Sequence, residues 1–165
     1  MFKKKLGIIG IGNMGSAFLN GLISSKMMEP DDILIHDIDK AALKERNEFG
    51  VEVANDNIDL VKNARYVLIA VKPQVIDGVL TEIAPSVTEH QALVSIAAGV
   101  TLKHLETFLS EGVGIVRVMP NTPALVGAGA SVMAPNEFIS EEDKEFVKKI
   151  LNSMGIAFEL DEKHL

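Results

Sequence analysis

Three glycines near the start of the chain have a spacing that lets a backbone turn bind phosphate groups. They follow an apolar run at residues 6–9, precede a helical pattern, and belong to the segment Gly10-Ile11-Gly12-Asn13-Met14-Gly15. In such a turn Gly10 allows the sharp bend, Gly12 lets the backbone approach a pyrophosphate, and Gly15 lets the helix lie close to the sheet. The helix N-terminus then offers unpaired N–H groups and a positive dipole. The pattern predicts a dinucleotide-binding site.

A carboxylate follows the next expected strand, at the distance at which a ribose would be bound. Asp37 comes just after the strand expected at 33–35 and lies 22 positions beyond Gly15, close to the spacing of roughly 20 residues in dinucleotide-binding units. We expect its carboxylate to accept hydrogen bonds from the adenosine ribose. The simpler interpretation is that Asp37 is only a turn residue beside Asp39.

Two further segments follow apolar strands, where the ligands of parallel sheets bind. In Ala70-Val71-Lys72-Pro73, Pro73 can begin a helix and hold Lys72 extended, so that its ammonium could meet a ribose or phosphate. A solvated lysine is the alternative. After the strand expected at 92–96, Ala97, Ala98 and Gly99 leave room for a flat ligand. Tight packing of strand on helix is the more frequent reason for such small residues.

A loop with two prolines follows the strand expected at 114–118. Asn121 and Thr122 lie between Pro120 and Pro123 and present paired hydrogen-bond donors and acceptors. A carboxamide such as that of nicotinamide requires paired groups of this kind. The alternative is an Asn/Thr/Pro turn without a ligand.

The elements that must position these segments alternate along the whole chain. Strands are expected near 6–9, 33–35, 51–53, 66–70, 92–96, 114–118, 130–134 and 156–160, and helices from 14, at 40–48, 58–62, 75–83 and 102–109, and from 141. This alternation predicts an α/β fold of Rossmann type, a doubly wound, mostly parallel sheet of about eight strands with helices on both faces. We expect one dinucleotide-binding domain over residues 1–165.

Composition narrows the class of function. The 165 residues are 47% hydrophobic and 24% charged, as in globular proteins. The chain has no cysteine, and its four histidines lack metal-ligand spacing, so no metal is expected. The net charge of −7 argues against nucleic acid or an anionic membrane as partner, and no apolar run is long enough for a signal peptide or a span. We therefore expect a cytoplasmic protein.

Together these segments resemble the Δ1-pyrroline-5-carboxylate reductase family. The resemblance rests on the glycine turn, on Ala-Val-Lys-Pro at 70–73, on Ser-Ile-Ala-Ala-Gly-Val at 95–100 and on Arg-Val-Met-Pro-Asn-Thr-Pro-Ala at 117–124, and it covers essentially the whole chain. It implies hydride transfer from NAD(P)H to the C=N carbon of the small-molecule substrate 1-pyrroline-5-carboxylate, giving L-proline in the last step of proline biosynthesis.

The resemblance and the strand ends together give the expected cofactor-binding residues. Asn57 is included by the family pattern alone, since by itself it is expected to be the N-cap of the helix at 58–62. Asn121 and Thr122 are expected to line the nicotinamide side, and no catalytic residue is assigned. The full set is Gly10, Ile11, Gly12, Asn13, Met14, Gly15, Asp37, Asn57, Ala70, Val71, Lys72, Pro73, Ala97, Ala98, Gly99, Asn121 and Thr122.

The chain departs from the family pattern beside the expected ribose. Many members have an Asn-Arg or hydroxyl-bearing turn where this chain has Asp37-Ile38-Asp39-Lys40. A carboxylate repels a 2′-phosphate, and Lys40 cannot grip that phosphate in two places as an arginine could. We therefore expect NADH to be used at least as well as NADPH.

Members of the family continue beyond a segment like that at 161–165 into a helical domain. That domain supplies the dimer interface, much of the substrate site and the usual proton donor. We therefore expect this chain to be the cofactor-binding half, inactive alone, of a protein that is a homo-oligomer at full length. The alternatives are another reductase of the same architecture, of β-hydroxyacid or deazaflavin-linked type, and a non-catalytic sensor of nicotinamide dinucleotides.

Overall fold

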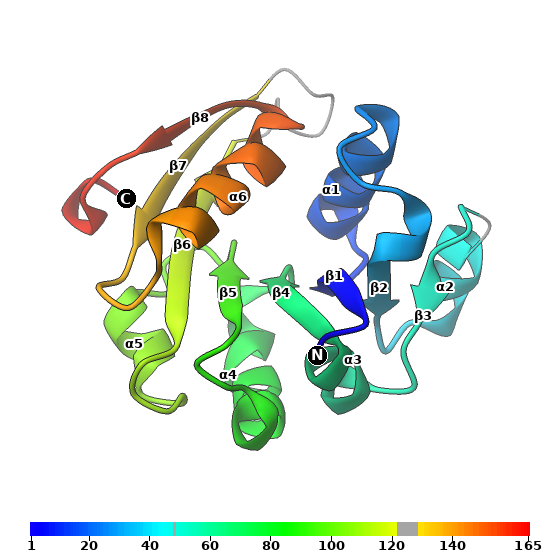
Figure 1. The fold of residues 1–165 in the computed structure, drawn as a ribbon, viewed down its shortest axis with the longest axis horizontal. Helices are drawn as coiled ribbons and strands as arrows, with labels where there is room; N and C mark the ends of the chain where they lie inside the picture. Colours follow the sequence, from blue (N-terminus) through cyan, green and yellow to red (C-terminus); the bar gives the residue numbers. More distant parts are fainter. Residues whose placement is uncertain (48, 122–128) are drawn as a thin grey trace.

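A single eight-stranded sheet forms the centre of the molecule (Figure 1). The computed structural model describes residues 1–47, 49–121 and 129–165. The strands are β1 (Lys4–Ile9), β2 (Ile33–His36), β3 (Glu52–Val53), β4 (Ala64–Ile69), β5 (Ala92–Ser95), β6 (Gly114–Pro120), β7 (Gly129–Pro135) and β8 (Gly155–Glu159). Their order is β3-β2-β1-β4-β5-β6-β7-β8. Only the pair β6–β7 is antiparallel among these strands, so the predicted doubly wound, mostly parallel sheet is confirmed.

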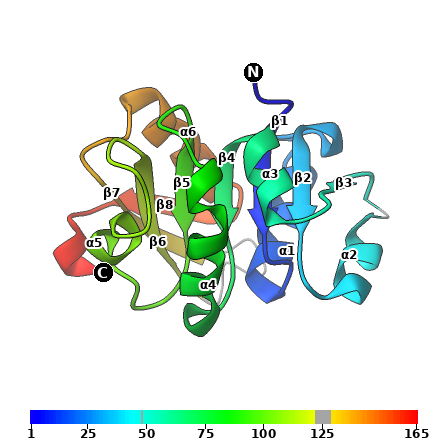
Figure 2. The ribbon, with the colours of Figure 1, turned by 90° about the horizontal axis from the view of Figure 1, so that it is seen from below.

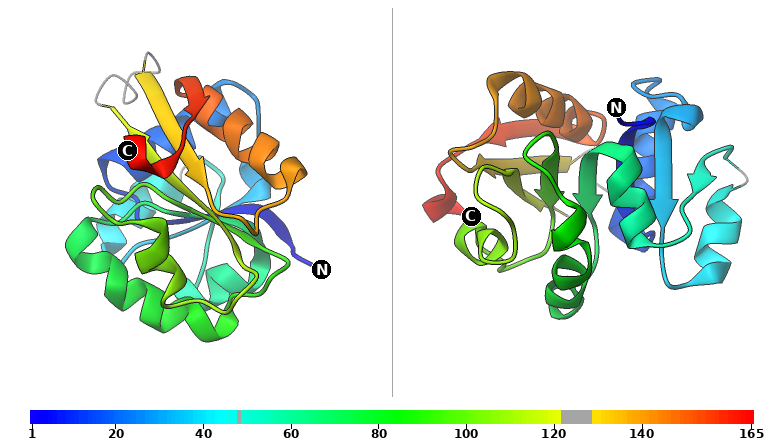
Figure 3. Two further views of the ribbon diagram at one scale, coloured as in Figure 1. Left: turned by 90° about the vertical axis from the view of Figure 1, so that its left-hand side faces the viewer. Right: turned by 60° about the horizontal axis from the view of Figure 1, so that its bottom comes forward.

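Helices cover both faces of this sheet, as predicted (Figures 2 and 3). One face carries α1 (Asn13–Ser24), α2 (Lys40–Asn47) and α6 (Glu141–Asn152), and the other carries α3 (Asn57–Asn63), α4 (Pro73–Ile83) and α5 (Leu102–Glu106). Short 3-10 turns are η1 (Pro30–Asp32), η2 (Ala84–Ser86) and η4 (Glu162–His164). Two separate buried clusters fill the two layers, one around Phe18 and Leu22 and one around Leu60 and Leu80. Burial on both faces explains the unbroken apolar runs of the central strands.

The element bounds differ from the expected ones at two places that affect the site. The helix expected at 102–109 ends at Glu106, because Phe108 and Leu109 donate to carbonyls three residues back and so tighten the last turn. Strand β6 continues to Pro120, two residues beyond its expected end, because it pairs with β7 as far as Pro120 and Ser131. The longer strand carries Met119 and Pro120 to the edge of the sheet.

Strand β8 lies at one edge of the sheet, as predicted for residues 156–160. Ile156 and Phe158 alternate along it, followed by Leu160 just beyond its end, and they are 61%, 51% and 44% exposed. Alternate residues of a strand share one face, so these side chains form an exposed apolar row. Among the described residues, no helix has both the length and the apolar composition needed to cross a membrane.

Candidate functional site

The ends of neighbouring strands bring most of the predicted residues to one edge of the sheet. Backbone hydrogen bonds hold these ends in line, with Gly10 N donating to His36 O (2.9 Å), Ala70 N to Ile9 O (2.8 Å) and Ile96 N to Ile69 O (3.3 Å). Strands β2, β1, β4, β5 and β6 are parallel, so all five carboxyl ends meet here. Open α/β sheets bind their ligands at this edge.

The glycine turn has the backbone geometry that its sequence predicts. Gly10 has φ +97°, which a side chain rarely adopts. A Cβ on Gly15 would collide with the carbonyl oxygen of Gly10, whereas a Cβ on Gly12 would meet no atom within 4 Å. Gly12 is also the N-cap of α1, and because a glycine has no side chain, no N-cap side chain bonds the first N–H groups of the helix. The turn therefore presents open space and helix N–H groups together, which fits a pyrophosphate.

Asp37 is fixed between the glycine turn and the end of β2. Its Oδ2 accepts a hydrogen bond from Ile11 N (2.7 Å), and its Oδ1 accepts one from Asp39 N (2.8 Å). A carboxylate oxygen has two lone pairs, so each oxygen can still accept a ribose hydroxyl. Asp37 lines an open cavity of about 650 Å³ together with His36, Ile38, Lys40 and residues of α2.

Asn57 is not the N-cap of α3, and this expectation is wrong. Asp56 caps the helix instead, its Oδ1 accepting a hydrogen bond from Asp59 N (2.7 Å). An ionised carboxylate one residue earlier is the stronger acceptor for that N–H. Asn57 is the first helical residue and is 6% exposed, with its Oδ1 2.8 Å from Nδ1 of His36. It therefore orients an imidazole at the end of β2, a contact between residues 21 positions apart that no local pattern indicates.

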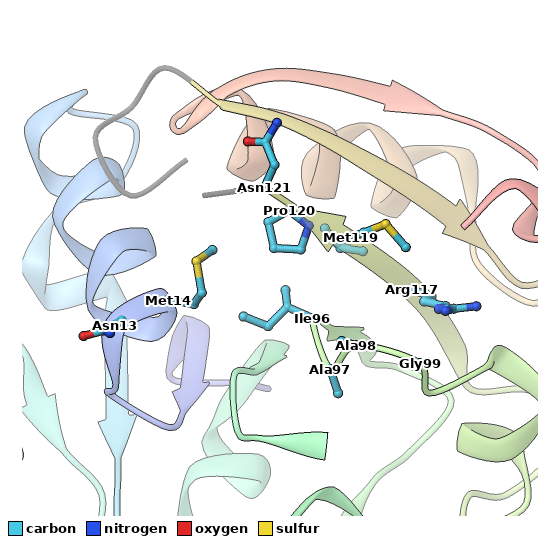
Figure 4. A pocket seen from close by; sticks show the side chains of 11 residues that line it. Asn13, Met14, Ile96, Ala97, Ala98, Gly99, Arg117, Met119, Pro120 and Asn121 are labelled. Atoms are coloured by element: carbon cyan, nitrogen blue, oxygen red, sulfur yellow. The ribbon is translucent and has the colours of Figure 1, made fainter. Parts of the chain in front are cut away.

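A second cavity, of about 380 Å³, lies beyond the end of β5 and beside the last four residues of β6 (Figure 4). Figure 4 shows the side chain of Ile96 extending toward Met14 of α1, while the side chain of Arg117 points away from Met14. Ala97, Ala98 and Gly99 form part of the wall, and their small size keeps the space open. The expected residues Asn13, Met14, Ala97, Ala98, Gly99 and Asn121 are thus brought together.

Within the described part of the chain, the side-chain oxygen of Asn121 makes a hydrogen bond, whereas its amide nitrogen stays available. Its Oδ1 accepts a hydrogen bond from Ala130 N (3.1 Å), which leaves its amide N–H groups as the donors that it can offer to a ligand. Thr122, expected beside it, lies outside the described residues.

The segment at 70–73 has the predicted backbone but stays outside both cavities. Pro73 begins α4, and Lys72 precedes it in an extended conformation (ψ 150°). A Cβ on Gly10 would press on the Ala70 carbonyl and come close to Val71, so this segment packs beside the glycine turn. The side chain of Lys72 is exposed and lines neither cavity.

Sequence reasoning missed an ion pair behind the second cavity. Arg117 of β6 is 7% exposed and lines the cavity, and its Nη1 donates to Glu162 Oε2 (3.3 Å). The same Glu162 oxygen accepts the first N–H of α5, from Leu102 (2.6 Å). The two partners are 45 residues apart, and no local pattern could have linked them.

Comparisons with known proteins agree with this geometry. The family model for NADP oxidoreductase, coenzyme F420-dependent, matches residues 5–99. A pyrroline-5-carboxylate reductase of Escherichia coli is 41% identical over 157 residues, which cover 94% of this chain and 58% of that protein. The solved pyrroline-5-carboxylate reductase of Coxiella burnetii has 31% identity and a TM-score of 0.91, covering 98% of this chain and 60% of that one.

A second solved structure carries a cofactor. Plasmodium falciparum pyrroline carboxylate reductase with NADP bound has 32% identity and a TM-score of 0.87, covering 99% of this chain and 60% of that one. This chain thus spans about 60% of the length of these relatives. By sequence and fold, the chain belongs to the family of NADP oxidoreductases, coenzyme F420-dependent, and its resemblance to the pyrroline-5-carboxylate reductases is confirmed.

Proposed function

We propose that this chain is the NAD(P)H-binding part of a cytoplasmic, homo-oligomeric reductase that converts 1-pyrroline-5-carboxylate to L-proline. The observation that carries the proposal is the position of the glycine turn between two cavities. Asp37, in the first cavity, is hydrogen-bonded to Ile11 of the turn. Asn13 and Met14, at the other end of the turn, line the second cavity. A dinucleotide has the same order of parts, an adenosine, a pyrophosphate and a nicotinamide nucleoside.

In this arrangement the residues of the chain bind and orient the cofactor. A bound dihydronicotinamide supplies the hydride for the C=N carbon, while the ring nitrogen of the substrate takes a proton. The amide N–H groups of Asn121 are placed to bind the nicotinamide carboxamide, and Ala97 to Gly99 leave room for the ring. Arg117 is the only ionisable side chain among the described residues that line this cavity, and it is paired with Glu162. We therefore assign no proton donor within the described part of the chain.

The proposal includes binding of NADH at least as tightly as NADPH. Because two backbone N–H groups hold the carboxylate of Asp37, it cannot turn away from a 2′-phosphate without losing both hydrogen bonds. Calorimetric titration of the chain with each dinucleotide tests this. We expect the dissociation constant for NADH to equal that for NADPH or to be smaller, and a tenfold tighter binding of NADPH, about 1.4 kcal/mol, contradicts it.

The reductase activity requires its own experiment. The complete gene product is mixed with NADH and 1-pyrroline-5-carboxylate, and loss of the dihydronicotinamide absorbance is followed together with formation of proline. We expect both to proceed at the same rate, since one hydride is transferred for each proline formed. Saturable NADH binding without any proline would contradict the reductase and favour a sensor of nicotinamide dinucleotides.

A further inference from the structure

We propose that Arg46 binds a phosphate of the dinucleotide, a role that rests on the proposed function. Arg46 lies in the last turn of α2, and its Nε donates a hydrogen bond to Ser16 Oγ (3.1 Å). Ser16 is buried in α1 and donates in turn to the carbonyl oxygen of Ile11 (2.9 Å). This chain of hydrogen bonds attaches the guanidinium of one helix to the glycine turn that precedes another.

The guanidinium lies at the wall of a third cavity, which opens beside the glycine turn. This cavity measures about 460 Å³, and Arg46 is the only charged side chain among the described residues that line it. The other lining residues are Ile11, Gly12, Asn13, Ser16, Ala17 and Asn20. Ile11 and Gly12 belong to the glycine turn, and Asn13 is the first residue of α1. A pyrophosphate would be bound at these residues. The cation is therefore placed at the most negative part of the expected ligand.

The Nη groups of Arg46 are available to bind a phosphate. An arginine carries five N–H donors in a planar fork that fits two phosphate oxygens at once. Nε is held by Ser16, and Arg46 makes no other side-chain hydrogen bond and no ion pair with the residues that the structure describes. The ring of Phe49 lies 5.9 Å from its Cζ. Ser16 and Phe49 thus restrict the side chain while its Nη groups stay open to a ligand.

The structure offers a reason for a cation at this point. The chain has a net charge of −7, and the carboxylate of Asp37 is bonded to the same turn through Ile11 N. A negative dinucleotide would be repelled by that carboxylate, because charges a few ångströms apart interact strongly at a partly buried site. Arg46 offsets this repulsion on the other side of Ile11.

Two phosphates share this chemistry, the pyrophosphate and the 2′-phosphate of NADPH, and calorimetry with two cofactors distinguishes them. We compare the chain with Arg46→Gln, which keeps a polar side chain and removes the charge. Loss of a charge-assisted contact should weaken binding about ten- to hundredfold. An equal loss for NADH and NADPH assigns Arg46 to the pyrophosphate, whereas a loss for NADPH alone assigns it to the 2′-phosphate.

Three further variants separate binding from folding. Lys149→Gln removes the same charge from the exposed face of α6 and should leave both dissociation constants unchanged. Arg46→Lys keeps the charge but not the fork, and Ser16→Ala keeps Arg46 but removes its anchor, so each should give a smaller loss than Arg46→Gln. The thermal midpoint of each variant is measured without cofactor, to show that it is folded.

The inference is overturned if folded Arg46→Gln and Ser16→Ala bind both cofactors within about twofold of the unaltered chain, as expected for a solvated surface charge. A different result identifies failure of the proposed function. If the unaltered chain binds neither NADH nor NADPH, the dinucleotide site itself is wrong, and the role of Arg46 is wrong with it.

Discussion

Similar charged side chains lie at the two ends of the parallel strands but make different contacts. We call the side of the sheet where these strands begin the amino edge, and the side where they end the carboxyl edge. At the amino edge, Asp143 of α6 accepts two hydrogen bonds from Arg65 Nη2 (2.8 and 2.9 Å) and one from the hydroxyl of Tyr66 (2.6 Å). At the carboxyl edge, Asp37 accepts hydrogen bonds only from backbone N–H groups within the described residues. The first carboxylate accepts three hydrogen bonds from side chains, whereas the second accepts two from the backbone and keeps a lone pair on each oxygen for a ligand.

Aromatic rings pack beside the Asp143 carboxylate. Tyr66 stacks on Phe146 (4.2 Å between ring centroids), and Arg65 lies over the Tyr66 ring (4.8 Å). Burial and the hydrogen bond to Asp143 raise the pKa of Tyr66. Burial alone would raise the pKa of Asp143, but the hydrogen bonds from Tyr66 and Arg65 outweigh it and lower that pKa. The amino edge therefore stabilises the fold, and the carboxyl edge is left open to bind.

The largest effect is expected at the amino edge, from Asp143→Ala. This change leaves Arg65 and Tyr66 without their acceptor and should lower the free energy of unfolding by about 3 kcal/mol. The figure is taken at the low end because the Arg65 side chain is 34% exposed and solvent screens part of the interaction. Urea unfolding measures the loss, and NADH affinity should not change. Glu145→Ala, at an exposed position on the same helix, is the control, and lost affinity with unchanged stability would contradict the comparison.

Protonation of the same carboxyl group should give a smaller effect, because it removes the charge but keeps the side chain. Since the pKa of Asp143 is lower in the folded chain, its contribution is present above the ordinary carboxyl pKa and is lost as the pH falls below about 4. The raised pKa of Tyr66 adds a loss of stability above about pH 10. The free energy of unfolding, measured at a series of pH values, should therefore change less with pH for Asp143→Asn than for the unaltered chain, both below about pH 4 and above about pH 10. Identical pH profiles would show that the cluster contributes nothing.

At the carboxyl edge, Gly12→Ala should separate binding from stability. A Cβ on Gly12 meets no atom of the chain, so the thermal midpoint without cofactor should stay the same. The methyl group would occupy the space of the pyrophosphate and should weaken NADH binding by about 2 kcal/mol. Gly15→Ala is the matched change, and it should lower stability as well, because its Cβ collides with the Gly10 carbonyl. Equal behaviour of the two variants would contradict the assigned roles of these glycines.

Local patterns were sufficient to predict most of the carboxyl edge. The positive φ of Gly10 and the start of α4 at Pro73 each depend on residues within a few positions. Parallel pairing then brings the strand ends together, so the two cavities follow from the order of the elements. Asn57 is the exception, because Asp56 is the N-cap of α3 and the Oδ1 of Asn57 contacts Nδ1 of His36 instead.

The contacts that the sequence could not predict join residues far apart in the chain. Arg46 meets Ser16 across 30 positions, and Asp143 meets Arg65 across 78. Each depends on how two helices or a helix and a strand are placed, and periodicity does not determine this. The antiparallel pairing of β7 with β6 could not be predicted for the same reason, because an apolar run predicts a strand but not its direction.

The smallest effect should come from Glu162, which combines features of both edges. It is a side-chain acceptor for the buried Arg117, and it also accepts the N–H of Leu102 just after the 97–99 wall of the second cavity. Glu162→Gln keeps the shape and an amide oxygen that can still accept from Arg117 and Leu102, but it removes the negative charge beside Arg117. We expect about 1 kcal/mol less stability and a loss of NADH affinity of only a few fold, with exposed Glu111→Gln as the control. A change in stability alone would place Glu162 with the amino-edge cluster as a purely structural residue, whereas a change in both shows that the cavity wall is held in place from the far end of the chain.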